Sequence, residues 1–93
     1  MAKLNNQTGI TIYTTDYCPY CHAAKALLRS RGLEYNEIDV TQDQAKRQEM
    51  MERSGRRTVP QVFFGDNHIG GNDDLQTYVR NVVDVAEVEK AAA

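Results

Sequence analysis

The sequence predicts a single α/β domain built on a four-stranded mixed sheet with helices on both faces. Two strand-like segments alternate with two helical patterns, which is the order expected for parallel strands joined by a helix. A hairpin signal and a third helical pattern follow, and these add antiparallel strands and a last helix. The chain has 93 residues, of which 41% are hydrophobic and 26% charged, which fits one small domain over 1–93. Residues 1–8 and 90–93 are expected to be its frayed ends.

The first half of the chain supplies two strands and the first helix. Ile10–Tyr13 alternates Ile and Tyr with Thr and predicts the first strand. Tyr20–Arg31 contains no proline or glycine and predicts a helix that stops before Gly32, since glycine is common just past a helix end. Residues 33–40 predict the second strand. Its apolar residues fall on both parities, so either the alternating pattern is broken or both faces of the sheet are partly covered.

The second half adds a helix, a hairpin and a last helix. Thr41 has capping-box spacing with Gln44, so a second helix is expected to begin there and to end at Gly55. The apolar run at 62–64 and a short partner at 68–69 predict a hairpin. Asn72 is expected to cap a third helix that packs on the sheet. Its core residues are expected to be Leu75, Tyr78, Val79 and Val82.

The two cysteines of the chain lie together in Y-C-P-Y-C-H at 17–22. Pro19 suits the first helical position, so Cys18 should stand at the helix start, where free N–H groups and the helix dipole stabilise a thiolate. Helical spacing predicts that Cys18 faces water and that Cys21 is half covered, which suits an attacking thiol and a shielded resolving thiol. The polar strip of Cys18 should also contain His22, Lys25 and Arg29. The opposite, covered arc should contain Tyr20, Ala23, Ala24, Leu27 and Leu28.

The same pair could instead be two core cysteines or half of a zinc site. Zinc usually takes four protein ligands, and the sequence has no second C-x-x-C and no H-x-x-x-H. No metal site is therefore expected. The redox interpretation is the one that the spacing favours.

Charge and hydropathy narrow the remaining classes of function. The net charge is −2 with both signs interspersed, which argues against a nucleic-acid or membrane-surface role. The first nine residues lack the apolar core of a signal peptide, and no segment approaches membrane-spanning length. A C-x-x-C pair without an export signal predicts a reducing compartment, with the cytoplasm as the default.

Three motifs, in this order, resemble the glutaredoxins, a glutathione-dependent family within the thioredoxin-fold superfamily. They are C-P-Y-C-H at 18–22, T-V-P-Q-V-F at 58–63 and G-G-N-D-D-L at 70–75, and the resemblance covers about 10–78. It implies a thioredoxin-like fold with Cys18 as the nucleophile and Cys21 as the resolving thiol. It also implies a monomer with no tightly bound cofactor, glutathione as reducing co-substrate, and disulfide-containing or glutathionylated proteins as substrates.

The resemblance further implies a glutathione groove. The peptide bond before Pro60 should be cis, and Val59 should offer its backbone N–H and C=O to the cysteinyl part of glutathione. The γ-glutamyl carboxylate should meet backbone N–H groups of Asn72 and Asp73, and its ammonium should meet Asp73 or Asp74. Arg56 or Arg57 is a candidate for the glycine carboxylate. The implied binding residues are Tyr20, Thr58, Val59, Pro60, Gly71, Asn72, Asp73 and Asp74.

Two positions depart from the family pattern, and two other functions stay open. Thr15 stands where many glutaredoxins have lysine, and Asn72 stands where many have cysteine. One alternative function is a carrier of a glutathione-ligated [2Fe–2S] cluster, although Pro19 should hinder cluster assembly. The other is a non-catalytic binding module. Taken alone, the acidic turn at 73–74 is explained by the helix dipole.

Overall fold

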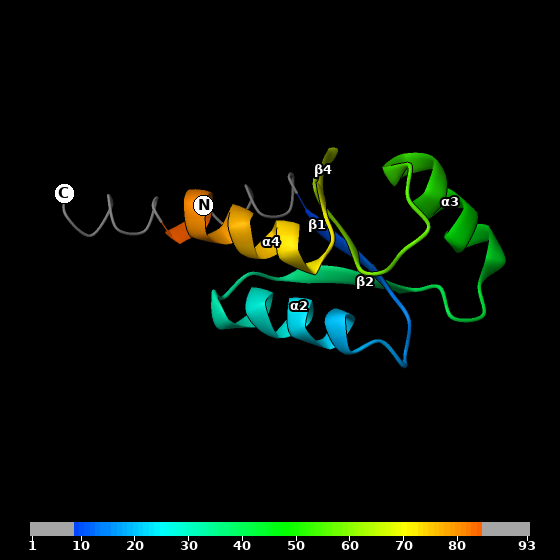
Figure 1. The fold of residues 1–93 in the computed structure, drawn as a ribbon, viewed down its shortest axis with the longest axis horizontal. Coiled ribbons are helices and arrows are strands. Elements are labelled where there is room, and N and C mark those ends of the chain that lie inside the picture. The colour runs from blue at the N-terminus through cyan, green and yellow to red at the C-terminus, as the bar shows by residue number, and fades with distance from the viewer. Residues whose placement is uncertain (1–8, 85–93) are drawn as a thin grey trace.

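A four-stranded mixed sheet forms the centre of the protein, as predicted (Figure 1). The computed structural model describes residues 9–84, so the predicted frayed ends lie outside the described residues. The strand order is β2-β1-β3-β4, with β1 parallel to β2 and antiparallel to β3, and β3 antiparallel to β4. The strands are β1 (Ile10–Thr14), β2 (Tyr35–Asp39), β3 (Gln61–Phe64) and β4 (Asn67–Gly70).

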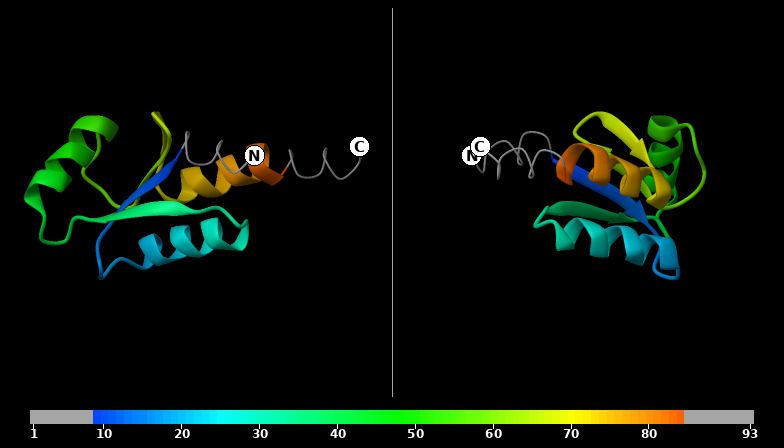
Figure 2. Two further views of the ribbon diagram at one scale, coloured as in Figure 1. Left: turned by 180° about the vertical axis from the view of Figure 1, so that it is seen from behind. Right: turned by 60° about the vertical axis from the view of Figure 1, so that its left-hand side comes forward.

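Helices cover both faces of this sheet, which confirms the predicted architecture (Figure 2). One face carries α2 (Pro19–Ser30) and α4 (Asn72–Tyr78), and α4 continues into a π-helical turn, η1 (Val79–Val83). The other face carries α3 (Gln44–Ser54). The starts of α2 and α4 are therefore on the same side of the sheet.

The core consists of two apolar clusters, one on each face. Neighbouring side chains of a strand point to opposite faces, so Ile12 joins the cluster under α2 and α4 while Tyr13 joins the cluster under α3. The sequence left open whether the second strand has a broken pattern or is partly covered on both faces, and the structure shows the latter, since Tyr35 packs on the first cluster and Ile38 on the second. The fully buried side chains of the two clusters include Leu28, Val62, Leu75, Met50 and Val40.

The predicted cap of α3, Thr41, is wrong by two residues. Asp43 caps the helix, and its carboxylate accepts from the Lys46 backbone N–H at 3.0 Å. The Thr41 hydroxyl is used elsewhere, because it accepts from the Asp16 backbone N–H at 3.0 Å. The end of the helix is as predicted, with Gly55 in the left-handed conformation at φ 71°.

The last helix departs from the prediction at both ends. Gly71 occupies the cap position, so Asn72 is the first helical residue and not the cap. Val82 was expected in the core but is 46% exposed, while Val83 packs on the first cluster. The π-helical turn explains this, because its wider hydrogen-bonding pattern shifts the buried face along by a residue. The sequence left the tail after Val83 undecided between helix and strand, and residues 85–93 lie outside the described part.

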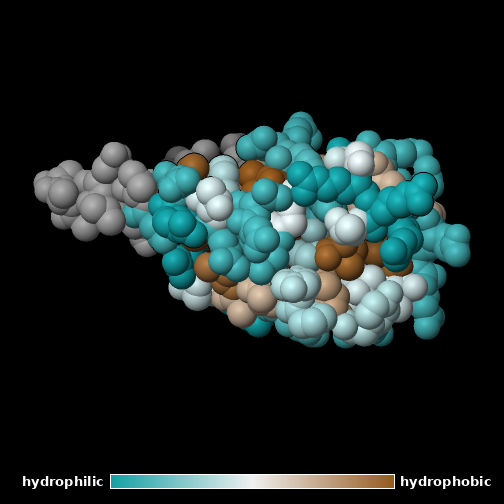
Figure 3. All heavy atoms as spheres, in the orientation of Figure 1, coloured by the Kyte–Doolittle hydropathy of each residue, from teal (hydrophilic) through white to brown (hydrophobic). Residues whose placement is uncertain are grey.

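Hydrophilic residues predominate on the face shown in Figure 3, where hydrophobic residues form small, separate patches. Among residues 9–84, the large hydrophobic side chains that are exposed are Tyr17, Tyr20 and Val82. Within residues 9–84 no helix has the length and apolar character needed to cross a membrane.

Candidate active site

Cys18 stands at the start of α2, as the sequence predicted. Its backbone is extended (φ −99°, ψ 112°), and Pro19 begins the helix. The Cys18 sulfur accepts a hydrogen bond from the Cys21 backbone N–H at 3.1 Å, so the side chain itself caps the helix. The sulfur therefore lies at the N-terminal end of α2, where the unpaired backbone N–H groups of a helix are found.

Cys18 was predicted to face water, and this prediction is wrong. Its exposed fraction is 8% and that of Cys21 is 0%, so the expected order of exposure holds but Cys18 is nearly covered. The cover comes partly from the segment before β3, since the Val59 carbonyl oxygen lies 3.8 Å from the Cys18 sulfur. Tyr17 and Tyr20 beside the helix start are 73% and 65% exposed. The Cys18 sulfur is therefore recessed, while two tyrosines close to it in sequence are exposed.

The buried arc of α2 is also rotated from the predicted one. Cys21, Ala24 and Leu28 are fully buried and form its centre. Tyr20 and Ala23, which were expected on the covered arc, are exposed. Because Cys21 lies at the centre of the buried face, it is more enclosed than the predicted half-covered position.

Enclosure keeps Cys21 protonated. Burial raises the pKa of Cys21 to about 12, and the hydrogen bond with Cys18 adds to the effect. The Thr15 backbone N–H and the Lys25 ammonium act in the opposite direction but are weaker. Cys21 is therefore a thiol at neutral pH and does not compete as the first nucleophile.

The cations predicted beside the cysteines are tied to the second strand. The Lys25 ammonium pairs with Glu37 at 2.9 Å, and the Thr14 hydroxyl donates to the same carboxylate oxygen at 2.7 Å. The hydrogen bond from Lys25 is the main cause of a lowered pKa of Glu37. Arg29 donates to the Tyr35 hydroxyl at 2.8 Å. These contacts fix α2 to β2, and they are not directed at the Cys18 sulfur.

The peptide bond between Val59 and Pro60 is cis, which confirms the prediction. The segment before it is held by Gln61, whose side-chain amide donates to the carbonyl oxygen and the hydroxyl of Thr58 at 3.0 and 3.1 Å. Val59 thereby places its carbonyl beside the Cys18 sulfur.

A groove of about 340 Å³ runs from this segment to the start of α4, within the range of roughly 300–1,000 Å³ typical of small-molecule sites. The structure brings together in it all eight residues predicted to bind glutathione. Cys18 lies at its edge, next to Val59. Of the two candidate arginines, Arg56 lines the groove and Arg57 does not. The lining residues are Tyr20, Arg56, Thr58, Val59, Pro60, Gly71, Asn72, Asp73 and Asp74.

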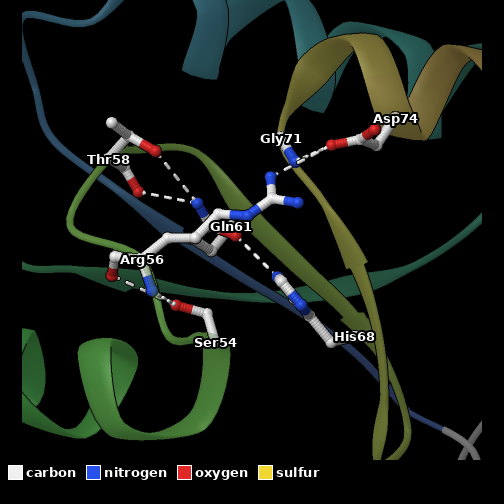
Figure 4. Close-up of polar contacts among 7 residues, drawn as sticks. All are labelled: Ser54, Arg56, Thr58, Gln61, His68, Gly71 and Asp74. Carbon is white, nitrogen blue, oxygen red and sulfur yellow. Dashed lines mark hydrogen bonds and ion pairs between the residues drawn. The ribbon is translucent and has the colours of Figure 1, made fainter.

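The two neighbouring aspartates at the far end of the groove differ. The Asp74 carboxylate accepts from the Gly71 backbone N–H and from Arg56, both at 3.1 Å (Figure 4). The Gly71 hydrogen bond, followed by Arg56, lowers the pKa of Asp74. A Cβ at Gly70, which has φ +124°, would overlap this carboxylate, so the position needs glycine. Asp73 is exposed, and its side chain makes no hydrogen bond to any residue between 9 and 84.

The side chain of Asn72 adds an unusual feature to this end of the groove. Its Oδ1 atom is buried and has no hydrogen-bond partner in the described part of the chain. The Thr15 hydroxyl oxygen near the cysteines is the other such atom. Both occur at the positions where the sequence departs from the family pattern.

Sequence reasoning missed Gln61 and His68. Gln61 is fully buried, and its amide oxygen lies 2.7 Å from His68 Nε2 on the next strand. The sequence did contain a sign of this: Gln61 lies two residues before Phe63 in a central strand, so its side chain points to the same buried face as the Phe63 ring. No three His, Cys, Asp or Glu side chains between residues 9 and 84 are grouped as metal ligands.

Comparisons with known proteins agree with this geometry. The glutaredoxin family model matches residues 10–69. Glutaredoxin 3 of Escherichia coli (strain K12) is 56% identical over 67 residues, which cover 72% of this chain and 81% of that protein. The solution structure of glutaredoxin from Brucella melitensis has a TM-score of 0.70 at 49% identity, covering 82% of this chain and 83% of that one. A crystal structure of a buckwheat glutaredoxin–glutathione complex has a TM-score of 0.75 at 31% identity, covering 98% and 86%. The chain belongs to the glutaredoxin family of glutathione-dependent thiol–disulfide oxidoreductases.

Proposed function

We propose that this protein reduces protein disulfides and glutathione mixed disulfides through a cycle of Cys18 and Cys21, with glutathione as the reductant. The observation that carries the proposal is the position of the Cys18 sulfur, 3.8 Å from the Val59 carbonyl at the edge of the groove. A glutathionyl disulfide that pairs with the Val59 backbone as an added strand brings its sulfur to Cys18.

The cycle begins when the Cys18 thiolate attacks one sulfur of a protein disulfide. A mixed disulfide forms, and the other substrate sulfur leaves as a thiolate and takes up a proton. Cys21 then loses its proton and attacks the Cys18 sulfur, which closes the Cys18–Cys21 disulfide and releases the second substrate thiol. A first glutathione thiolate attacks Cys18 and frees Cys21. A second attacks the bound glutathione sulfur, which releases oxidised glutathione and restores Cys18.

A glutathionylated protein needs only the first cysteine. Cys18 attacks the glutathione sulfur, the protein thiol leaves, and a second glutathione removes the first. Cys21 takes no part in this route. Its burial supports the division, since an enclosed thiol reacts only with a sulfur already bonded to Cys18.

Backbone and side-chain groups along the groove hold the tripeptide. Val59 pairs with its cysteinyl backbone, and the N–H groups of Asn72 and Asp73 receive the γ-glutamyl carboxylate. Asp73 takes the γ-glutamyl ammonium, because Asp74 already accepts two hydrogen bonds. Arg56 supplies a guanidinium to the glycine carboxylate, and Tyr20 forms one wall.

The partners of this activity are glutathione and oxidised or glutathionylated proteins. One chain carries both sulfurs and the whole groove, so we propose that a monomer is the working unit. The cycle consumes reduced glutathione, which assigns it to a reducing compartment, the cytoplasm.

A coupled assay tests this function. Glutathione, glutathione reductase and NADPH are mixed with a glutathionylated peptide, and NADPH oxidation is followed with and without the protein. We expect turnover that depends on glutathione, and none when thioredoxin reductase replaces glutathione and its reductase. Turnover with thioredoxin reductase alone would contradict the proposal. The alternative, a [2Fe–2S] carrier, predicts a brown protein with visible absorbance after anaerobic purification and little turnover.

A further inference from the structure

The buried side chain of Gln61 links the groove to a histidine outside it. Its Nε2 lies 3.0 Å from the Thr58 carbonyl oxygen and 3.1 Å from the Thr58 hydroxyl. Its Oε1 lies 2.7 Å from Nε2 of His68 on β4 (Figure 4). Neither Gln61 nor His68 is among the residues that line the groove.

The donor and the acceptor of the hydrogen bonds that link Thr58, Gln61 and His68 follow from which of their atoms carry hydrogen. The Thr58 carbonyl has no hydrogen to give, so Gln61 must turn its NH₂ group toward it. Its amide oxygen then faces His68, which must carry a hydrogen on Nε2. Burial and the nearby Arg56 lower the pKa of His68, so the neutral ring is expected to hold its single hydrogen on that nitrogen near pH 7.

His68 is itself held in place. Its ring packs on Phe63 with centroids 4.9 Å apart and planes tilted by 34°, and it is half-buried. Phe63 belongs to the same strand as Gln61, and its ring is 2% exposed. The imidazole is therefore a fixed donor, and the amide that it orients is fixed in turn.

Thr58 depends on this amide. Its two hydrogen bonds from Gln61 are the side-chain-mediated contacts that hold it among residues 9–84, and the residue is otherwise exposed. Thr58 directly precedes Val59, whose carbonyl lies beside the Cys18 sulfur. A loosened Thr58 would let Val59 move relative to that sulfur.

We propose that His68 and Gln61 are positioning residues, which orient one another so that the Thr58–Val59 segment is held at the distance from Cys18 that a glutathionyl disulfide requires. This inference rests on the proposed function for its effect on catalysis, because it assigns Val59 as the backbone partner of glutathione. The order of the segment itself is independent of which disulfide binds.

Two variants test the proposal. His68→Phe keeps the ring stack on Phe63 and removes the donor. Gln61→Glu keeps the shape but removes the NH₂ group, so a carboxylate faces two Thr58 oxygens. Gln48→Glu, on the exposed surface of α3, is the matched control for the added charge. All three are measured at a temperature at which circular dichroism shows them folded.

The first measurement is independent of activity. Amide ¹⁵N order parameters at Thr58 and Val59 should fall from about 0.85, typical of rigid backbone, toward about 0.6 in His68→Phe and Gln61→Glu. The order parameter at Val62 within β3 should stay unchanged in both variants. In Gln48→Glu the order parameters at Thr58, Val59 and Val62 should all equal those of wild type. Wild-type values at Thr58 and Val59 in both variants would overturn the proposal.

The second measurement is the kinetics on a glutathionylated peptide. We expect KM to rise about three- to tenfold and kcat to stay within about twofold of wild type, because the loss lies in alignment of the bound disulfide. A merely structural role predicts lower stability with KM unchanged, and a fall in order without a rise in KM would overturn the proposal. If wild type itself shows no glutathione-dependent turnover, the proposed function fails, while the order parameters still decide whether the pair positions the segment.

Discussion

The starts of α2 and α4 use the same physics for different purposes. At α2 the cap residue is Cys18, and its sulfur accepts a hydrogen bond from the N–H of Cys21, so the capping atom is also the proposed nucleophile. At α4 the cap residue is Gly71, which has no side chain, and the Asp74 carboxylate returns to its N–H. A helix start attracts an anion in both cases. At α2 the side chain that occupies this place belongs to the helix cap itself, whereas at α4 we propose that the N–H groups of Asn72 and Asp73 receive the carboxylate of a ligand.

The two starts also differ in how they are anchored. α2 has 12 residues with three of them fully buried, and the ion pair of Lys25 with Glu37 ties it to the sheet. α4 has seven residues and then widens into a π-helical turn. The comparison teaches that the start of α2, the proposed reactive end, belongs to a long helix packed into the core, while the start of α4, the proposed binding end, belongs to a short helix that follows two glycines.

The largest expected effect breaks the packing under α2. Leu28→Ala should lower the free energy of unfolding by about 2–5 kcal/mol, because it removes a fully buried side chain and leaves a cavity. Val82→Ala, after α4, should cost less than about 0.5 kcal/mol, since Val82 is 46% exposed. Urea denaturation measures both. If both variants lost the same unfolding free energy, Val82 would be part of the core, and the π-helical turn would not expose Val82 and bury Val83 as described.

The second prediction concerns the free carboxylate at α4. Asp73→Ala should raise KM for a glutathionylated peptide about three- to tenfold with kcat little changed, because it removes the partner of the ligand's ammonium. The free energy of unfolding should be nearly the same as in wild type, since the Asp73 side chain makes no hydrogen bond within residues 9–84. An unchanged KM would remove Asp73 from the site.

The third prediction is the counterpart at the adjacent carboxylate. Asp74→Ala should lower the free energy of unfolding by about 0.5–2 kcal/mol, because the Gly71 N–H loses its acceptor. Its effect on KM should be smaller than that of Asp73→Ala. Thermal unfolding of the two variants side by side checks the division. If Asp74→Ala raised KM more while leaving stability intact, the roles of the two aspartates would be exchanged.

The smallest expected effect is a change in pH dependence. The hydrogen bond from Lys25 lowers the pKa of Glu37 below its ordinary value of 4.5, so the folded state binds this proton less readily than the unfolded state. The contribution of ionised Glu37 to the stability of the fold is therefore complete above about pH 5. It is lost as the pH falls through the pKa of Glu37 in the folded state. Glu37→Gln should flatten the fall in unfolding free energy between about pH 5 and 3. Glu34→Gln, an exposed neighbour without a described partner, should keep the wild-type slope.

Most of the fold followed from local patterns in the sequence. Strand alternation and the glycines after α2 and α3 predicted element order and both helix ends, because these depend on neighbouring residues. Capping was harder to predict. Thr41 and Asp43 are both good cap residues, but only Asp43 caps α3. The Thr41 hydroxyl accepts instead from the backbone N–H of Asp16, which is distant in sequence.

The candidate site was predictable in composition and less so in geometry. The motif resemblance named eight residues that line one groove. The recessed position of Cys18 was missed because its cover comes from Val59, which is 41 residues away in sequence. The roles of Gln61 and His68 were missed for the same reason, since a polar side chain inside a strand acquires its meaning only from the residue that faces it.

Replacing each cysteine in turn gives the most direct test of this account. Cys18→Ser and Cys21→Ser are compared in the glutathione-coupled assay, first with a glutathionylated peptide and then with a protein disulfide. We expect Cys18→Ser to be inactive on both substrates, and Cys21→Ser to reduce the glutathionylated peptide while losing activity on the protein disulfide. Equal inactivity of both variants on the glutathionylated peptide, or activity that survives in Cys18→Ser, would contradict the assignment of the recessed sulfur at the start of α2 as the nucleophile.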